Sequence, residues 1–192
     1  MIDEISNLKK NIDDHINVIK SLITLESEVL KAGSVMSGSL LSGGKVLFCG
    51  NGGSAADSQH LAAELTGRFV KDRPPIAAVA LSTDTSALTS ISNDYSYEEV
   101  FSRQVRAIGR PGDVLLAIST SGNSRNVIRA VEESRRIGIF TIGLLGHAGG
   151  SLLGTCDCSI VVASEVTARI QEAHILIGHT LCELIERDMG YA

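Results

Sequence analysis

Short apolar runs that alternate with helical patterns are the feature that most limits how this chain can fold. The runs are nearly unbroken stretches of Val, Ile, Leu and Ala at 46–49, 76–81, 114–118, 140–145 and 160–163. Runs without polar alternation are typical of strands buried on both faces, and strand–helix alternation indicates parallel pairing. We therefore predict a three-layer α/β/α sandwich with a mostly parallel five-stranded sheet.

Helical periodicity occupies the segments around these runs. We expect helices at about 2–31, 54–67, 84–107, 123–137 and 166–188. In the first of them, Ile5, Ile12 and Ile19 recur every seven residues within a wide apolar stripe. Such a stripe can pack on its own domain or against another subunit, and the pattern alone favours neither.

Length and charge exclude several classes of protein. The 192 residues fit a single domain over 1–192, in which 1–42 is a helical segment suited to oligomerisation. A net charge of −5 argues against a nucleic-acid surface. No apolar run approaches the roughly 20 residues of a membrane span. The acidic start is unlike a signal peptide, so we expect a cytoplasmic protein.

Two loops rich in small and hydroxyl residues follow the first and third apolar runs. The first is Gly50-Asn51-Gly52-Gly53-Ser54, and the second runs from Ser119 through Thr120 and Ser121 to Ser124. Both precede an expected helix, whose free N–H groups and dipole attract an anion. Because the carboxyl ends of parallel strands share one sheet edge, two such loops favour a phosphate or sugar site there.

The alternative for these loops is that Ser and Asn only cap helices. Neither loop has the G-x-G-x-x-G spacing of a dinucleotide site, and the chain lacks the G-x-x-x-x-G-K-[ST] motif of nucleoside triphosphate binding. Hydroxyl donors without a phosphate-binding lysine favour a sugar phosphate over a nucleotide.

A second polar set lies on two of the expected helices. His60 and Glu64 are four residues apart and share a helix face, and one broad face of the last helix can present both Gln171 and His179. Imidazole and carboxylate groups suit a divalent metal or acid/base catalysis. Spacing alone cannot assemble a site from two helices, so an ordinary surface pair stays open. His174 falls on the apolar side of the last helix, where a packed histidine is expected.

Taken together, four segments resemble the sugar isomerase (SIS) domain and, within it, the phosphoheptose isomerase family. They are C-G-N-G-G-S-A-A-D-S-Q-H-L-A-A-E-L at 49–65, A-L-S-T-D-T-S-A-L-T-S-I-S-N-D at 80–94, A-I-S-T-S-G-N-S at 117–124 and A-R-I-Q-E-A-H at 168–174. The resemblance covers essentially the whole chain and implies a flavodoxin-like fold with a long N-terminal helix.

The resemblance implies a ketose–aldose isomerisation of sedoheptulose 7-phosphate to D-glycero-D-manno-heptose 7-phosphate through an enediol. This is the first step toward the nucleotide-activated heptose of lipopolysaccharide or other bacterial surface glycans. By the same resemblance, the substrate-binding positions are Asn51, Gly52, Gly53, Ser54, Glu64, Asn93, Asp94, Ser119, Thr120, Ser121, Ser124 and Gln171. One Zn²⁺ per site is implied at His60, Glu64, Gln171 and His179, with Glu64 and His179 as the catalytic pair.

The family resemblance also implies a homotetramer with sites at subunit interfaces, which favours an intersubunit role for the first helix. The competing function is a non-catalytic SIS protein that binds the replication initiator or senses a sugar phosphate. That replication-associated group resembles this chain but lacks residues like Glu64 and His179, so these two positions favour the enzyme. One departure is Ala168, where some family members have an acid.

Overall fold

The computed structural model describes residues 2–191, with side chains from residue 7 onward, so the side chain of Ile5 lies outside the described part. Five parallel strands form one sheet: β1 (Val46–Cys49), β2 (Ala78–Ala80), β3 (Val114–Ser119), β4 (Phe140–Gly146) and β5 (Cys158–Val162). Their spatial order is β2-β1-β3-β4-β5. This order, parallel throughout, is the flavodoxin-like arrangement, and it confirms the predicted fold class.

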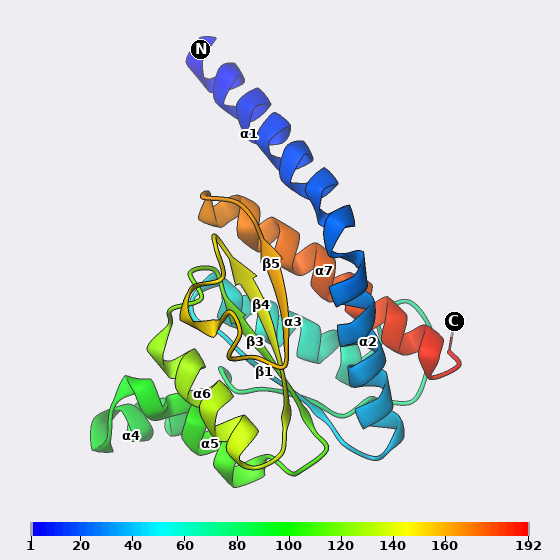
Figure 1. The fold of residues 1–192 in the computed structure, drawn as a ribbon, viewed down its shortest axis with the longest axis vertical. Coiled ribbons are helices and arrows are strands. Elements are labelled where there is room, and N and C mark those ends of the chain that lie inside the picture. The colour runs from blue at the N-terminus through cyan, green and yellow to red at the C-terminus, as the bar shows by residue number, and fades with distance from the viewer. Residues whose placement is uncertain (1, 192) are drawn as a thin grey trace.

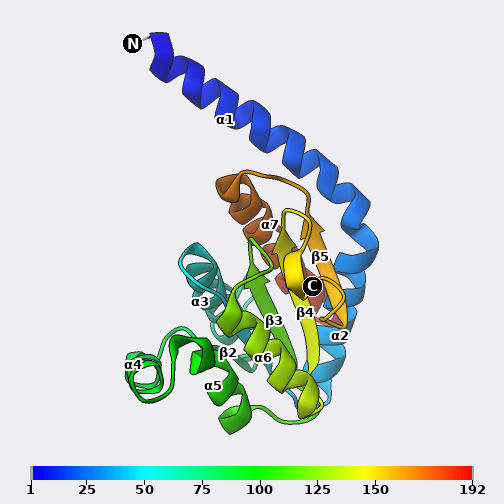
Figure 2. The same cartoon turned by 60° about the vertical axis from the view of Figure 1, so that its left-hand side comes forward.

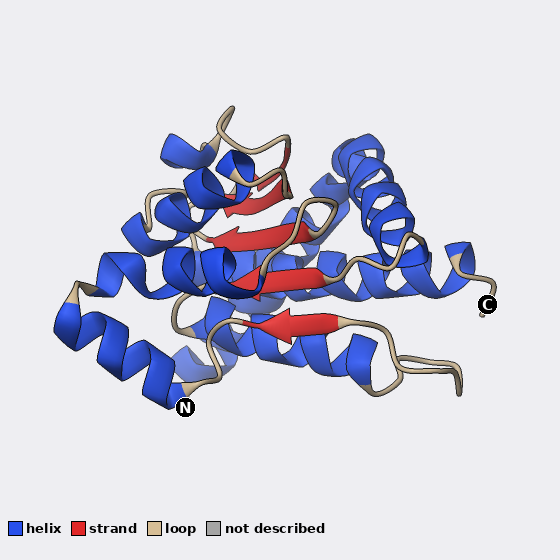
Figure 3. Cartoon of the chain, turned by 90° about the horizontal axis from the view of Figure 1, so that it is seen from below, coloured by secondary structure: helices blue, strands red, loops and turns tan. Residues whose placement is uncertain are grey.

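Helices cover both faces of the sheet (Figures 1 and 3). They are α1 (Ile2–Ser21), α2 (Glu26–Leu41), α3 (Gly53–Thr66), α4 (Thr85–Asp94), α5 (Val100–Ile108), α6 (Arg125–Arg136) and α7 (Thr167–Asp188), with short 3₁₀ turns η1 (Leu22–Leu25), η2 (Tyr97–Glu99) and η3 (Gly150–Leu152). No described helix combines the length and the apolar composition that crossing a membrane requires.

Two apolar clusters separate the layers. On one face, strand side chains such as Phe48, Leu116 and Leu144 pack with α2, α3 and α7. On the other face, neighbours such as Leu47 and Leu115 pack with α5 and α6. Since successive strand residues point to opposite faces, every residue of β1 and β3 is buried. This is why the runs contain no polar alternation.

The N-terminal helix differs from its predicted bounds of 2–31. The chain stays helical as far as Leu41, and the 3₁₀ turn η1 separates α1 from α2. α2 packs on the sheet and α7, whereas α1 contacts α7 through bonds such as His15–Glu172 and then projects beyond the body of the molecule (Figures 1 and 2). Its Leu8, Ile12 and Ile16 are exposed.

The bounds of one further helix and of one strand also differ from those predicted. The expected helix over 84–107 is divided into α4, η2 and α5, because the chain turns at Tyr95 and Ser96 is fully extended. Asp84 caps the first piece by accepting a hydrogen bond from the amide of Ala87 at 2.9 Å. β2 covers only the middle of the run at 76–81, and before it the Ile76 amide donates to the Leu65 carbonyl of α3 rather than to β1.

A buried ion pair joins the loop after α3 to the end of α7. The Arg73 Nε lies 2.7 Å from Glu186 Oε1, with side-chain exposures of 0% and 3%. Burial raises the pKa of Glu186, but hydrogen bonds from Arg73 and from backbone amides outweigh it, so the pKa is lower than usual. The charge of Glu186 is therefore retained inside the fold by its donors.

Replacing Arg73 with Met should lower the free energy of unfolding by about 3–5 kcal/mol, because Glu186 would stay buried without its partner. Urea unfolding at a fixed protein concentration measures this change. Arg68→Met, at an exposed position in the same loop, should stay within about 0.5 kcal/mol of the unmodified protein. A loss below about 1 kcal/mol in Arg73→Met would contradict the structural role of the pair.

Candidate active site

The candidate site begins where the sheet order reverses direction. β1 lies between β2 and β3, so the loops that leave β1 and β3 diverge toward opposite faces at the carboxyl edge. In sheets of this kind the crevice outside this switch point holds the ligand. The loops here are the two that the sequence singled out, at 50–53 and 119–124.

Some hydroxyls of the 119–124 loop bond within the loop and maintain its shape, and others are free to donate to a ligand. Ser119 is buried; its Oγ donates to Ser124 Oγ at 3.2 Å and accepts from the amide of Gly122 at 3.1 Å. Ser121 is exposed, and its Oγ accepts from the Asn123 amide at 3.1 Å, which leaves its own proton free to donate. Thr120 is half-buried beside it. Ser119 thus shapes the loop, and Thr120, Ser121 and Ser124 line it.

A second loop, at 146–151, packs directly over the hydroxyl loop. Gly122 adopts φ 65°, and a Cβ there would lie 1.9 Å from the carbonyl oxygen of Gly149. Ser151 donates from its amide to Asn123 Oδ1 at 2.9 Å. Only glycine fits at 122, because both the backbone conformation and the close approach exclude a side chain.

A reciprocal amide pair joins the first loop to the start of α6. Asn51 and Asn126 exchange two hydrogen bonds of 2.8 Å, and the Tyr97 hydroxyl donates to Asn51 Oδ1 at 3.2 Å. Asn126 is buried. Asn126 and Tyr97 were not identified from the sequence, although the position of Asn126 in the first turn after the hydroxyl loop is a usable signal.

Three side chains of types that can ligate a metal converge between α3 and α7. The ligand atoms of His60, Glu64 and His179 all lie within 4.8 Å of one another, and they form the one such group among the described residues. His60 Nε2 is 2.9 Å from His179 Nε2 and 3.4 Å from Glu64 Oε1. The structure thus brings together two helices that sequence spacing could not relate.

Close packing of α3 against α7 creates this convergence. Gly178 faces Leu61, and a Cβ at 178 would meet both Leu61 Cδ atoms at 2.7 Å. A Cβ at Gly53, at the start of α3, would lie 2.3 Å from Gln171 Nε2 near the start of α7. The two helices therefore run side by side in the same direction, and His179 comes level with His60 and Glu64.

The donor set fits zinc. Two imidazoles and a carboxylate are common zinc ligands, and ligand atoms around a tetrahedral zinc ion lie about 3.3 Å apart. The 3.4 Å between His60 and Glu64 matches this spacing, and the 2.9 Å between the imidazoles is within a few tenths of it. Three protein ligands also leave one position for a further ligand or substrate.

The structure does not bring Gln171 to these three residues within one chain. Gln171 precedes His179 by eight residues on α7, which is about 12 Å along a helix axis. It lies instead at the amino end of α3, against Gly53.

The remaining predicted positions are dispersed. Ser54 is buried in the first turn of α3, whereas Gly52 and Gly53 are exposed at the switch point. Asn93 and Asp94 are exposed at the end of α4 on the other side of the sheet, where their side chains bond each other at 2.9 Å. Neither of these two contacts the cluster of His60, Glu64 and His179.

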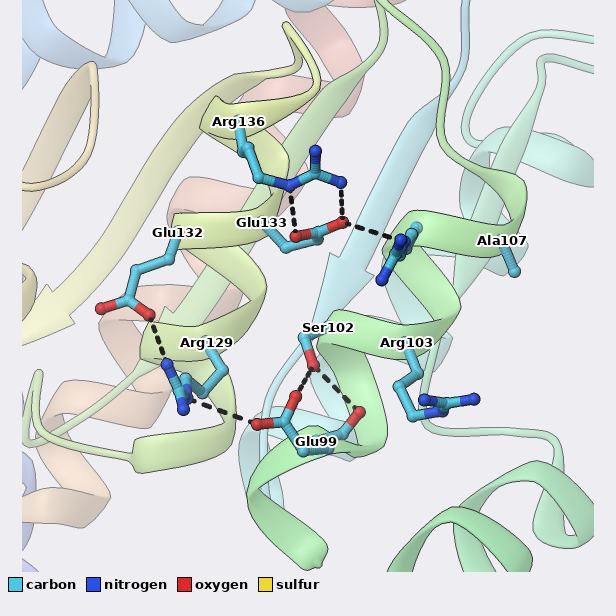
Figure 4. Close-up of a pocket in the computed structure, with 9 residues that line it drawn as sticks. Glu99, Ser102, Arg103, Ala107, Arg129, Glu132, Glu133 and Arg136 are labelled. Carbon is cyan, nitrogen blue, oxygen red and sulfur yellow. Dashed lines mark hydrogen bonds and ion pairs between the residues drawn. The ribbon is translucent and has the colours of Figure 1, made fainter. Parts of the chain in front are cut away.

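A separate groove of 660 Å³ lies between α5 and α6, away from the cluster (Figure 4). Its charged side chains pair largely with one another: Arg129 contacts Glu99 and Glu132, and Arg136 contacts Glu133. Because these guanidinium groups already have carboxylate partners, the groove offers few unpaired charges to a ligand.

His174 connects α7 to the carboxyl end of β4. Its Nε2 lies 3.0 Å from the carbonyl oxygen of Leu145, so Nε2 carries the proton. Burial lowers the pKa of His174 to about 4, and the bond to Leu145 offsets this only in part. The expectation of a packed histidine agrees with this position.

Gly146 follows Leu145 at the end of β4, and there is no room for a Cβ there between Thr120 O and Ile170.

Comparison with known proteins identifies the class. The family model described as SIS domain matches residues 12–146, more than half of the chain. The chain therefore belongs to the SIS domain family.

Within that family it groups with the phosphoheptose isomerases. The protein of this name from Rhodospirillum rubrum is 56% identical over 158 residues, covering 82% of this chain and 84% of that protein. Phosphoheptose isomerase 1 of Campylobacter jejuni is 49% identical over 182 residues, covering 95% and 98%. The solved phosphoheptose isomerase of Neisseria gonorrhoeae superposes with a TM-score of 0.91 at 44% identity, covering 97% of this chain and 100% of that one.

The titration of His174 should make stability depend on pH. The folded state keeps this imidazole neutral down to pH about 4, whereas the unfolded chain protonates it near 6.5. Since the unfolded state binds the extra proton, stability should fall as pH decreases from about 6.5 to 4, by up to about 3 kcal/mol.

Urea unfolding at pH 7 and pH 5 tests this with His174→Gln, whose amide can still donate to Leu145. The variant should lose less stability between the two pH values than the unmodified protein. Equal losses in both proteins would show that His174 does not titrate as inferred.

Proposed function

We propose that this chain isomerises sedoheptulose 7-phosphate to D-glycero-D-manno-heptose 7-phosphate. The observation that supports this most is the convergence of His60, Glu64 and His179 in a chain about half identical to named phosphoheptose isomerases. The product would enter the synthesis of nucleotide-activated heptose for bacterial surface glycans.

The 119–124 loop would hold the substrate phosphate. Thr120, Ser121 and Ser124 offer hydroxyl donors, and the amino end of α6 adds free N–H groups and the positive end of its dipole. The Asn51–Asn126 pair keeps the loop after β1 beside this anchor, where Gly52 and Gly53 leave room for the sugar chain.

The reaction moves a carbonyl from C2 to C1 with no net change in atoms. One proton leaves C1 and one is added to C2, while a proton passes between O1 and O2 through the enediol. Glu64 and His179 supply a carboxylate and an imidazole for these two tasks, because one can exchange the carbon-bound proton and the other the oxygen-bound proton. General acid/base catalysis of this kind contributes about 10²–10⁴-fold to a rate.

Zinc is the proposed metal, held by His60, Glu64 and His179 with Gln171 as the fourth ligand. When bound, the ion would polarise the carbonyl and stabilise negative charge on the enediol oxygens. Because Gln171 lies about 12 Å along α7 from His179, a Gln171 ligand would come from another subunit.

We propose that the active form is a homotetramer with its sites at subunit interfaces. The exposed apolar stripe of α1 supports this, as does a 410 Å³ groove between α1, α2 and α7 that Ile23, Leu30 and Leu176 help to line. Asn93 and Asp94, remote from the cluster in one chain, could then approach a neighbouring site. Sedimentation of the purified protein tests the assembly.

A non-catalytic sugar-phosphate binder would share the hydroxyl loop. It would have no need for an imidazole and a carboxylate within 4.8 Å of each other, so the His60, Glu64 and His179 cluster favours the enzyme. Following sedoheptulose 7-phosphate by NMR, with and without a chelator, tests turnover and its dependence on metal. Stable substrate signals in the presence of zinc would exclude the isomerase.

Glu64→Gln should reduce kcat about 100-fold or more, because the amide keeps the shape of the side chain but cannot accept a proton. Sedoheptulose 7-phosphate binding, measured by calorimetry, should weaken much less than kcat falls, since the phosphate anchor is intact. Glu183→Gln, exposed on α7, is the matched control and should behave like the unmodified protein. Turnover by Glu64→Gln at more than half the normal rate would exclude Glu64 as a catalytic group.

Ser121→Ala should mainly weaken substrate binding. Removing one hydrogen bond to a charged phosphate costs about 1.5–3 kcal/mol, which corresponds to a KM raised about 10–100-fold at similar kcat. Ser34→Ala, at an exposed position on α2, serves as the control. A variant with normal KM and reduced kcat would place the phosphate elsewhere.

A further inference from the structure

The loop between α3 and β2, residues 67–75, contains no regular helix or strand, yet α7 holds it at several points. Glu186 of α7 accepts hydrogen bonds from the amides of Phe69, Val70 and Lys71 at 3.3–3.4 Å. It accepts a fourth from the buried Arg73 side chain at 2.7 Å. One carboxylate therefore fixes the backbone of three consecutive loop residues.

Arg73 also closes the carboxyl end of α3. Its guanidinium donates to the carbonyl oxygens of Glu64 at 2.8 Å and Leu65 at 2.9 Å. These carbonyls belong to the last turn of α3, which has no intrahelical donors of its own. The ion pair thus connects the helix end that carries Glu64 to the loop that carries Phe69.

The Phe69 ring is stacked on the His179 imidazole. The ring centroids are 5.5 Å apart and the planes differ by 27°. His60 meets the same imidazole nearly edge-on, at 5.1 Å and 66°. Since aromatic pairs prefer offset stacked or edge-on arrangements, His179 is held between two rings that together favour one orientation. In this orientation its Nε2 faces His60 Nε2 at 2.9 Å.

We propose that Phe69 is a positioning residue that orients the His179 imidazole, with the buried Arg73–Glu186 pair setting the loop that presents it. The proposal rests on the role given above to His179. The Phe69 ring has no proton donor or acceptor to offer a reaction, so it acts through the plane of the His179 imidazole on which it stacks. Groups that orient a metal-binding histidine typically change metal affinity or activity 10–100-fold when removed.

Phe69 also packs against the apolar cluster that contains α3 and α7, so a purely structural role must be separated from positioning. Phe69→Leu keeps an apolar side chain and removes the ring, whereas Phe69→Tyr keeps the ring. Val70→Ala, an exposed side chain in the same loop, is the matched control, because its backbone amide still bonds to Glu186.

The experiment measures the zinc Kd of the full chain by competition with a chelator, together with Tm, KM and kcat. We expect Phe69→Leu to raise the zinc Kd about tenfold and to lower kcat with little change in KM. Phe69→Tyr and Val70→Ala should remain close to the unmodified protein. A zinc Kd of Phe69→Leu within twofold of that of the unmodified protein would overturn the proposal. Equal losses of zinc affinity and kcat in Phe69→Leu and Phe69→Tyr, in proportion to a lowered Tm, would overturn it as well.

The zinc measurement also separates this proposal from the proposed function. A raised zinc Kd in Phe69→Leu, in a protein that does not turn over sedoheptulose 7-phosphate, would support the positioning role and reject the isomerase. Normal turnover of sedoheptulose 7-phosphate by the unmodified protein, together with an unchanged zinc Kd in Phe69→Leu, would support the isomerase and reject the positioning role.

Discussion

The rest of the site depends on how closely α3 and α7 approach each other. At Gly178 there is no space for a Cβ beside Leu61, so the Leu61 side chain of α3 packs directly on the α7 backbone. This contact brings His179 level with His60 and Glu64, although 115 or more residues separate them along the chain. A larger side chain at 178 would collide with the buried Leu61 side chain and disturb the packing that holds the His179 imidazole beside its two neighbours.

Local sequence patterns predicted the layers of this fold well. The five apolar runs correspond to the five strands, because strands buried on both faces, such as β1 and β3, consist almost entirely of apolar residues, and this constraint is visible without any structure. Helix limits were less predictable. Nothing in the apolar periodicity signals the turn at Tyr95 that divides 84–107, or the 3₁₀ turn η1 that divides the helical segment expected over 1–42.

The two parts of the candidate site, the hydroxyl loop and the cluster on α3 and α7, also differ in how far the sequence predicts them. The hydroxyl loop was evident from sequence because its residues are consecutive and follow a strand. The grouping of His60 and Glu64 with His179 required either the family resemblance or the structure, since helical spacing relates residues on one helix only. Phe69 had no sequence signal, because its position is set by Glu186, more than a hundred residues later.

The positions of the phosphate loop and the polar cluster have a consequence for how such proteins diverge. The loop proposed to hold an anion is made by strand ends and glycine-controlled turns, whereas the groups proposed to transfer protons project from helix faces that are otherwise packed for stability. Exchanging Glu64 and His179 for inert side chains would leave the sheet and the loop unaltered. If the proposed roles hold, a chain of this design would lose its chemistry in two substitutions and would still bind a sugar phosphate, which is a short path from catalyst to sensor.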